Sequence, residues 1–239
     1  MPTYALKLTP RGARFGHRPV WEIPVRLTHW VTAFAITALF GTGMFISWPV
    51  VSSQGEPFQN FLMGRVREVH FICAYFLLFS FILRGYWFFV GNKYSRSGVP
   101  LIWRKDWWRA LWHQVLEYVA TKRGPVTIGH NSLAGLSYFL FVGGLGFLMI
   151  GTGFAMYSET NPGGFWDKLF GWVIPLFGGS YRTRLIHHTA AWGFVIFFLF
   201  HMYIILFDSV RWHNGLISSI FSGDKFWEDG DLDSDDWVS

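Results

Sequence analysis

The chain has 239 residues and a formal net charge of +5, and its composition excludes several classes of protein. Charged residues make up 15% and aromatic residues 21%, whereas ordinary soluble domains carry ~25% charged residues. So many apolar side chains exceed what the interior of a soluble protein of this size buries, and they also exclude a disordered chain. The single cysteine, Cys73, excludes a disulfide scaffold and thiolate sites for zinc or iron–sulfur clusters. Nine histidines remain as the abundant metal-binding side chains.

Four stretches are long and apolar enough to cross a bilayer, whose ~30 Å hydrocarbon core needs ~20 residues of helix. They cover residues 25–49, 66–91, 131–157 and 184–208. The first starts too late and is too long for a cleaved signal peptide, so we expect it to stay in the mature protein. A fifth apolar run, Leu169 to Tyr181, is too short and is broken by glycines and a proline, which predicts an interfacial or re-entrant loop.

The distribution of lysine and arginine predicts the orientation of the spans. These residues concentrate before the first span and between the second and third spans, and such loops stay in the cytoplasm. We therefore expect an all-α integral membrane protein, a four-transmembrane-helix bundle forming a single domain over residues 1–239, with both termini cytoplasmic. This topology explains the net charge without a nucleic-acid partner. No internal repeat is evident.

Two segments outside the spans carry a distinct pattern. In residues 100–120, Trp103, Trp107, Leu111 and Leu116 share one face of a basic segment, which is typical of an amphipathic helix in the headgroup region of the lipid bilayer. A helix that binds a partner protein is the alternative. The acidic tail, residues 224–239, predicts a solvated and mobile end.

Five histidines fall within the predicted spans, where ionisable side chains are costly and usually functional. They are His29, His70, His187, His188 and His201. A haem inside a membrane needs two neutral imidazoles from facing helices as axial ligands. A single histidine would favour a buried hydrogen-bonded side chain or a proton relay, whereas four histidines at two matched levels favour haem ligation. Zinc or non-haem iron draws its ligands to one locus, whereas these histidines lie at two depths.

Helix geometry selects among the histidines of the last span. His187 and His201 are fourteen residues apart, a rotation only about 40° short of four full turns and a rise of roughly 21 Å, so they share one face. His188 is thirteen residues from His201 and points to a different side. We predict His187 as a haem ligand and His188 as its neighbour.

The direction of each span sets the depth of its histidines and therefore the pairs. His70 and His187 lie near the outer surface, whereas His29 and His201 lie near the inner surface, which predicts two haems with these four ligands. Gly43, fourteen residues after His29, should face the outer haem. No nucleophile, phosphate loop or carboxylate dyad appears, so we expect an electron-transfer subunit rather than an enzyme.

Several short motifs, in this order, resemble the b-type cytochrome subunit of membrane-bound group 1 nickel–iron uptake hydrogenases. The related gamma subunits of formate dehydrogenases share the four-helix, two-haem plan. The resemblance covers about Trp21 to Ser222. The motifs are Pro24-Val25-Arg26-Leu27-Thr28-His29-Trp30, Asn60-Phe61-Leu62-Met63-Gly64 before His70, Gly129-His130-Asn131, Thr152-Gly153-Phe154-Ala155-Met156-Tyr157, Phe170-Gly171-Trp172-Val173-Ile174-Pro175, and His187-His188 followed by Trp192 and His201.

The resemblance implies a multi-pass protein of the bacterial inner membrane that holds two haem b groups through His29, His70, His187 and His201. It implies periplasmic hydrogenase small and large subunits as partners, with electrons passing from their iron–sulfur clusters to the inner haem and then to a quinone. It places His130 and Asn131 at the quinone, with Ser132 where the hydrogenase family commonly has proline. A helix cap at the membrane surface is the alternative for His130 and Asn131.

Two rival functions follow from the same residues. The same di-haem scaffold could serve another donor, such as formate dehydrogenase or a thiosulfate reductase. A haem-free membrane anchor or transporter is the rival of a different class, and a reduced-minus-oxidised absorption spectrum distinguishes it from a cytochrome.

Overall fold

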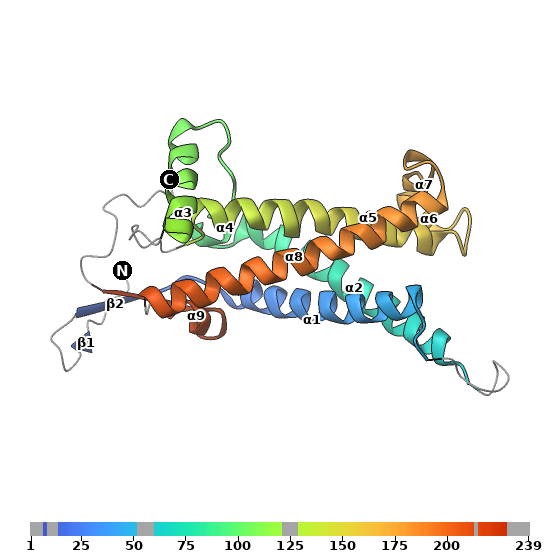
Figure 1. The fold of residues 1–239 in the computed structure, drawn as a ribbon, viewed down its shortest axis with the longest axis horizontal. Coiled ribbons are helices and arrows are strands. Elements are labelled where there is room, and N and C mark those ends of the chain that lie inside the picture. The colour runs from blue at the N-terminus through green and yellow to red at the C-terminus, as the bar shows by residue number, and fades with distance from the viewer. Residues whose placement is uncertain (1–6, 9–13, 52–59, 121–128, 213–214, 229–239) are drawn as a thin grey trace. The chain divides into compact units, whose positions relative to one another are not determined.

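The computed structural model describes residues 7–8, 14–51, 60–120, 129–212 and 215–228. Four helical segments in these ranges are long and apolar enough to cross a membrane (Figure 1). They are α1 (Ile23–Ser47), α2 (Leu62–Val90), the segment Ser132–Ser158, and Ser180–Val210 within α8 (Ser180–Trp212). Large apolar side chains such as Phe89 and Phe147 are more than two-thirds exposed on them, at 77% and 69%. Lipid must cover this surface, so the predicted four-helix integral membrane fold is confirmed.

The third span is not a uniform α-helix. It begins as α4 (Ser132–Ser137), continues as the π-helical segment η2 (Tyr138–Leu145) and ends as α5 (Gly146–Ser158). A π-helical turn accommodates one more residue than an α-turn, and its hydrogen bonds are less well aligned. Gly143 and Gly144 in this stretch lower the steric cost of the wide turn, because they carry no side chain.

The contacts between residues divide the chain into two units, which we describe separately. Unit 1 comprises Met1–Arg26, Gly85–Gly143 and Ile196–Ser239, and unit 2 comprises Leu27–Arg84 and Gly144–Val195. Unit 1 thus contains the segments that the charge distribution assigns to the cytoplasm. Unit 2 contains the two loops assigned to the opposite side.

Unit 1 contains a small antiparallel sheet that the all-α prediction omits. Its strands are β1 (Lys7–Leu8), β2 (Arg14–Pro19) and β3 (Asp224–Glu228), in the order β1-β2-β3. The register of β2 on β3 runs from Phe15 opposite Glu228 to Pro19 opposite Asp224. Helix α9 (Leu216–Ser222) leads into β3, and η1 (Lys93–Arg96) follows α2.

The predicted solvated tail is wrong for residues 224–228. The carbonyl of Gly223 accepts hydrogen bonds from the backbone N–H groups of Val20 and Trp21, at 2.8 and 3.0 Å, and β3 then pairs with β2. A count of charges along the chain misses this pairing, because the partner strand lies about 200 residues away in sequence. The rest of the predicted tail, residues 229–239, lies outside the described residues.

The predicted amphipathic helix is present as α3 (Lys105–Ala120), and of its predicted apolar face Leu111 and Leu116 are half-buried, whereas Trp103 lies before the helix and is exposed. Trp107 and Tyr118 are buried within unit 1, and the backbone N–H of Leu133 at the start of α4 donates to Gln114 Oε1 at 3.0 Å. Trp108 and Trp112 are exposed. The helix therefore packs on α4 with one side and presents tryptophans on the other.

Unit 2 has an aromatic core that joins three of its elements. Ala35 of α1, Leu77 of α2 and Ile150 and Phe154 of α5 are buried together. Phe154 stacks on Phe170, with ring centroids 5.7 Å apart. Phe170 ends α6 (Phe165–Phe170), and α7 (Val173–Leu176) follows, both at one end of α5 (Figure 1). These short helices occupy the fifth apolar run, which is confirmed as a segment that does not span.

Candidate haem-binding site

The ring of His70 on α2 is held by a threonine of α1. Thr42 Oγ1 lies 2.8 Å from His70 Nδ1. The hydroxyl proton of Thr42 is directed to the carbonyl of Ala38 at 2.7 Å, one turn earlier in the same helix. A hydroxyl has a single proton, so Thr42 Oγ1 accepts from His70 and Nδ1 carries the hydrogen. This tautomer puts the lone pair of a neutral imidazole on Nε2, the atom that can ligate a metal.

His187 on α8 is held in the same way by a threonine of α5. Thr152 Oγ1 lies 2.8 Å from His187 Nδ1, and its hydroxyl donates to the carbonyl of Leu148 at 2.7 Å. His187 is therefore also an Nδ1–H tautomer with its lone pair on Nε2. Thr152 is fully buried, so no water competes for this hydrogen bond.

A glycine next to each threonine makes room for the imidazole. A Cβ placed on Gly43 would lie 3.4 Å from His70 Cε1, and one on Gly153 would lie 3.2 Å from His187 Cε1. Side chains there would press on rings that the threonines hold in place. The prediction that Gly43 faces the outer site agrees with its position against His70.

The two threonines are the site residues that sequence reasoning missed. Their signal is a repeated tripeptide, Gly41-Thr42-Gly43 in α1 and Gly151-Thr152-Gly153 in α5, although no internal repeat was expected. The tripeptide alone does not show that its hydroxyl meets a histidine of another helix.

The outer pair fits a haem. His70 and His187 belong to the same unit and lie near enough for their charges to interact. Two neutral imidazoles on two different helices, each presenting Nε2, are the ligand set of a six-coordinate b-type haem. Among the described residues, no group of three or more His, Cys, Asp or Glu side chains is placed to hold a metal ion.

His188, the neighbour of His187, is engaged elsewhere. Its Nε2 lies 3.1 Å from Ser47 Oγ, and the Ser47 hydroxyl donates to the carbonyl of Gly43 at 2.9 Å. Ser47 Oγ also lies 3.4 Å from His188 Nδ1, so both ring nitrogens of His188 lie close to this serine of α1. This geometry supports the choice of His187 over His188.

The residues around His29 and His201 are described separately, because the two histidines fall in different units. Beside His29, Ser80 Oγ of α2 donates to the carbonyl of Thr28 at 3.0 Å and pairs with Thr32 Oγ1 at 2.7 Å. His201 stacks on Phe197, with ring centroids 5.5 Å apart and 20° between the planes. The pairing of His29 with His201 stays a prediction.

His130 and Asn131, the candidate quinone residues, have different surroundings in unit 1. Asn131 is the N-cap of α4, since its Oδ1 accepts from the backbone N–H of Ala134 at 2.7 Å. The helix-cap alternative therefore describes Asn131. His130 Nδ1 lies 3.1 Å from Ser97 Oγ, and the ring of Trp21 is 4.8 Å from its own. The Ser97 hydroxyl donates to the carbonyl of Tyr94, so His130 donates through Nδ1.

A buried polar cluster joins α3, α8 and β3 in unit 1. The Tyr118 hydroxyl donates to Asp208 Oδ2 at 3.0 Å and accepts from Asn131 Nδ2 at 3.2 Å. Burial, followed by the negative charge of Asp208, raises the pKa of Tyr118 well above its usual range. Burial lowers the pKa of Lys225 from 10.5 to about 8, and attraction to Asp208 opposes that change. Lys225 of β3 is thus buried close enough to Asp208 of α8 for their charges to attract.

The attachment of β3 should strengthen as pH rises. The folded pKa of Lys225, about 8, lies below its unfolded value of 10.5, so between these values the folded form binds fewer protons and its stability increases with pH. We expect proteinase K to release the segment after Ser222 roughly tenfold more slowly at pH 9 than at pH 7, after correction for protease activity. The variant Lys225→Met should lack this pH dependence. Equal pH dependence in the two proteins would contradict the assignment.

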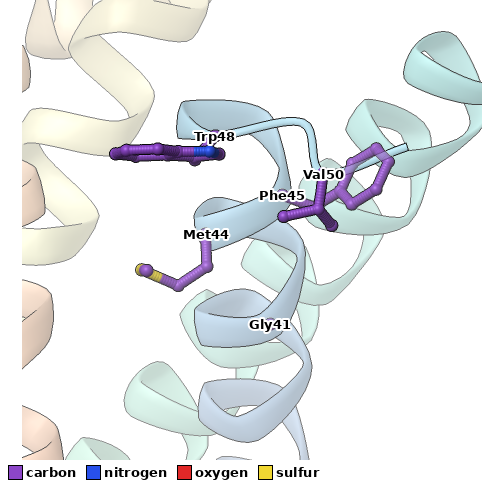
Figure 2. A pocket seen from close by; sticks show the side chains of 5 residues that line it. All are labelled: Gly41, Met44, Phe45, Trp48 and Val50. Carbon is purple, nitrogen blue, oxygen red and sulfur yellow. The ribbon is translucent and has the colours of Figure 1, made fainter. Parts of the chain in front are cut away.

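An apolar hollow lies on α1 beside Thr42 and Gly43. Its volume is ≈ 370 Å³, and it is lined by Gly41, Met44, Phe45, Trp48 and Val50. Figure 2 shows Met44 and Trp48 extending to the same side of the helix. Gly41 leaves open space, since a Cβ there would meet no atom within 4 Å.

The sequence is similar to those of known proteins. Residues 20–223 match the family described as prokaryotic cytochrome b561. A protein of Azotobacter chroococcum mcd 1 named "Probable Ni/Fe-hydrogenase B-type cytochrome subunit" is 43% identical over 88% of this chain and 89% of its own length. A protein of the same name from Bradyrhizobium diazoefficiens is 37% identical over 94% of each chain. The "Probable Ni/Fe-hydrogenase 1 B-type cytochrome subunit" of Escherichia coli K12 is 34% identical over 85% of this chain and 88% of its own.

The four apolar helices define a multi-pass membrane protein, and the matches to known proteins make it a cytochrome of the b type. The chain belongs to the prokaryotic cytochrome b561 family. The resemblance inferred from the motifs is thereby confirmed, and so is the expectation of an electron-transfer protein that carries haem b.

Proposed function

We propose that the chain is the di-haem cytochrome b subunit of a membrane-bound nickel–iron hydrogenase and that it passes electrons across the bacterial inner membrane to quinone. The observation that carries the proposal is the pair His70 and His187, two neutral imidazoles on α2 and α8 with Nδ1 bound by threonine. The names of the relatives, which are cytochrome subunits of Ni/Fe-hydrogenases, support a hydrogenase as the electron donor.

The chain would act as a scaffold that fixes two one-electron carriers at two depths. Haem b supplies reversible one-electron transfer when bound. His70 and His187 hold the outer haem, and His29 and His201 hold the inner one. Aromatic pairs such as Phe40 with Trp192, with ring centroids 5.4 Å apart, pack α1 against α8 in unit 2.

The side facing the hydrogenase would be formed by unit 2. Its short helices α6 and α7 expose Phe165, Trp172 and Leu176, each at least 60% accessible. Exposed apolar residues clustered on a loop are typical of a protein-binding surface. We infer that this surface meets the periplasmic small subunit, which in turn binds the large subunit. Both termini and the loop between α2 and α4 would then lie in the cytoplasm, as their lysines and arginines indicate.

The quinone would bind beside His130, near the inner haem. The Nδ1–H of His130 is held by Ser97, and Trp21 packs against the ring. The imidazole of His130 would exchange a proton with a quinone oxygen. Asn131 would act on the site indirectly, because it caps α4 and binds Tyr118. With proton uptake from the cytoplasm, hydrogen oxidation outside would build a proton-motive force.

The rival donors are distinguished by co-purification. The tagged protein is extracted in a mild detergent, and we expect hydrogenase small and large subunits to accompany it, with hydrogen reducing the b-type absorption band. If a formate dehydrogenase co-purifies instead, and formate but not hydrogen reduces the b-type band, then the alternative donor is correct. A purified protein without any b-type band would leave only the haem-free anchor or transporter.

The variant His130→Leu should impair quinone reduction without altering the haems. Loss of one hydrogen bond to the quinone corresponds to roughly a tenfold lower kcat/KM. Hydrogen-dependent reduction of a soluble quinone analogue measures this value, and the amplitude of the reduced haem bands should stay unchanged. His113→Leu, the same substitution at an exposed position of α3, is the control. Equal rates in the two variants would remove His130 from the quinone site.

A further inference from the structure

We propose that Thr42 and Thr152 are positioning residues for the outer haem, which set the tautomer and orientation of its two ligands and lower its reduction potential. The proposal rests on the assignment of His70 and His187 as ligands. It adds a role to two residues that touch neither haem iron nor quinone. The evidence is the geometry of two hydrogen-bond pairs within unit 2.

Each threonine forms the same two bonds in the same directions. The distances from hydroxyl oxygen to imidazole Nδ1 are 2.8 Å at Thr42 and 2.8 Å at Thr152. The distances from hydroxyl oxygen to the carbonyl four residues earlier are 2.7 Å at both. The carbonyl takes the hydroxyl proton, so the orientation of the bond to histidine is determined by the helix itself. In the other tautomer the hydroxyl would have to turn from the carbonyl to Nδ1, and the bond from threonine to its own helix would be lost.

The bond also fixes the rotation of each ring. Gly43 and Gly153 lie against the Cε1 atoms of His70 and His187, at 3.4 and 3.2 Å from an ideal Cβ, so the ring edge fits closely on the helix that carries the threonine. The threonine hydroxyl and the glycine both contact the Nδ1–Cε1 edge of the ring, so together they hold that edge against the helix. The two ligand planes, and therefore the ligand field of the iron, would be set by α1 and α5 rather than by the helices that carry the histidines.

The effect on potential follows from the charge on the ligand. An imidazole that donates from Nδ1 gains electron density and becomes a stronger donor to iron, which favours the oxidised form. Removing the acceptor should therefore raise the potential of the outer haem. Both ligands carry the same kind of bond, so the two substitutions should act in the same direction and add.

The test compares variants of the full complex. Thr42→Val and Thr152→Val keep the shape of the side chain and remove the acceptor, whereas Thr42→Ser keeps the acceptor. The control is Thr37→Val: Thr37 forms the same type of bond to the carbonyl of Ala33, at 2.9 Å, but is exposed on α1. The readouts are the haem b content per chain, the midpoint potential of each haem and the low-spin ferric electron paramagnetic resonance signal.

In each valine variant we expect one haem to titrate at a higher potential and to give a shifted low-spin signal. The double variant should show a larger shift of both. Thr42→Ser and Thr37→Val should behave like the wild-type protein. Loss of one haem in the valine variants with retention in Thr42→Ser supports the same role. Unchanged potentials and signals in the double variant would refute the proposal, and so would equal haem loss in Thr42→Val and Thr42→Ser. The variant His70→Leu tests the ligand assignment separately. If it loses one haem, His70 remains a ligand even where the threonine variants refute the positioning role. Retention of both haems in His70→Leu would instead refute the assignment.

Discussion

In the variant His201→Leu, hydrogen should still reduce the cytochrome, but electrons should not reach quinone. His201 is the predicted inner ligand on α8, fourteen residues beyond the outer ligand His187 on the same uninterrupted helix, Ser180–Trp212. A leucine at this position cannot ligate iron, so the haem content per chain should fall by about half as one of two six-coordinate sites is lost. The outer haem keeps its ligands and its contact with the donor.

Two assays measure this result on one preparation. Pyridine haemochrome absorbance per chain gives the haem content, and hydrogen-dependent quinone reduction gives the rate, which should fall to background. The control His113→Leu changes an exposed histidine and should keep both values. A one-haem variant that reduces quinone at the wild-type rate would contradict a route through His201.

In the variant His187→Leu, the outer haem should be lost and the electron path should be cut at its entrance. Hydrogen should then fail to reduce the remaining haem, whereas a chemical reductant should still reduce it. The reason is that Nε2 of His187, whose tautomer is set by Thr152, has no substitute nearby. Both ring nitrogens of His188 lie within 3.4 Å of Ser47 Oγ, so we expect that His188 does not replace His187.

The matched control for this prediction is His188→Leu, at the next residue of α8. It should keep both haems and at least most of the hydrogen-dependent reduction. Equal haem loss in His187→Leu and His188→Leu would contradict the choice between these adjacent histidines. Loss in His188→Leu alone would reverse it.

The spans and the face of α8 could be predicted from the sequence because they depend on local properties. Apolar length determines which helices cross a membrane, and a fourteen-residue spacing brings side chains to one face of any continuous α-helix. His187 and His201 satisfy this condition in α8. The prediction that Gly43 faces the outer site used the same arithmetic on α1, which is also continuous.

The hydrogen-bond partners could not be predicted, because they depend on which helices pack together. A threonine in an apolar helix ordinarily bonds to its own backbone, and Thr42 and Thr152 do so as well as accepting from histidine. The second bond, from histidine Nδ1 to the threonine oxygen, depends on the packing of α1 on α2 and of α5 on α8. Strand β3 was missed for the same reason, since its partner β2 lies at the other end of the chain.

The haem content of the purified wild-type protein tests the central claim most directly. Haem b is measured by pyridine haemochrome absorbance against chain concentration from quantitative amino-acid analysis, and a potentiometric titration resolves the components. The four ligands His29, His70, His187 and His201 predict two haem b groups per chain and two one-electron components. One haem b per chain and one redox component in the titration would contradict the claim that a haem lies at each of two depths. They would also contradict the proposed path from hydrogenase to quinone.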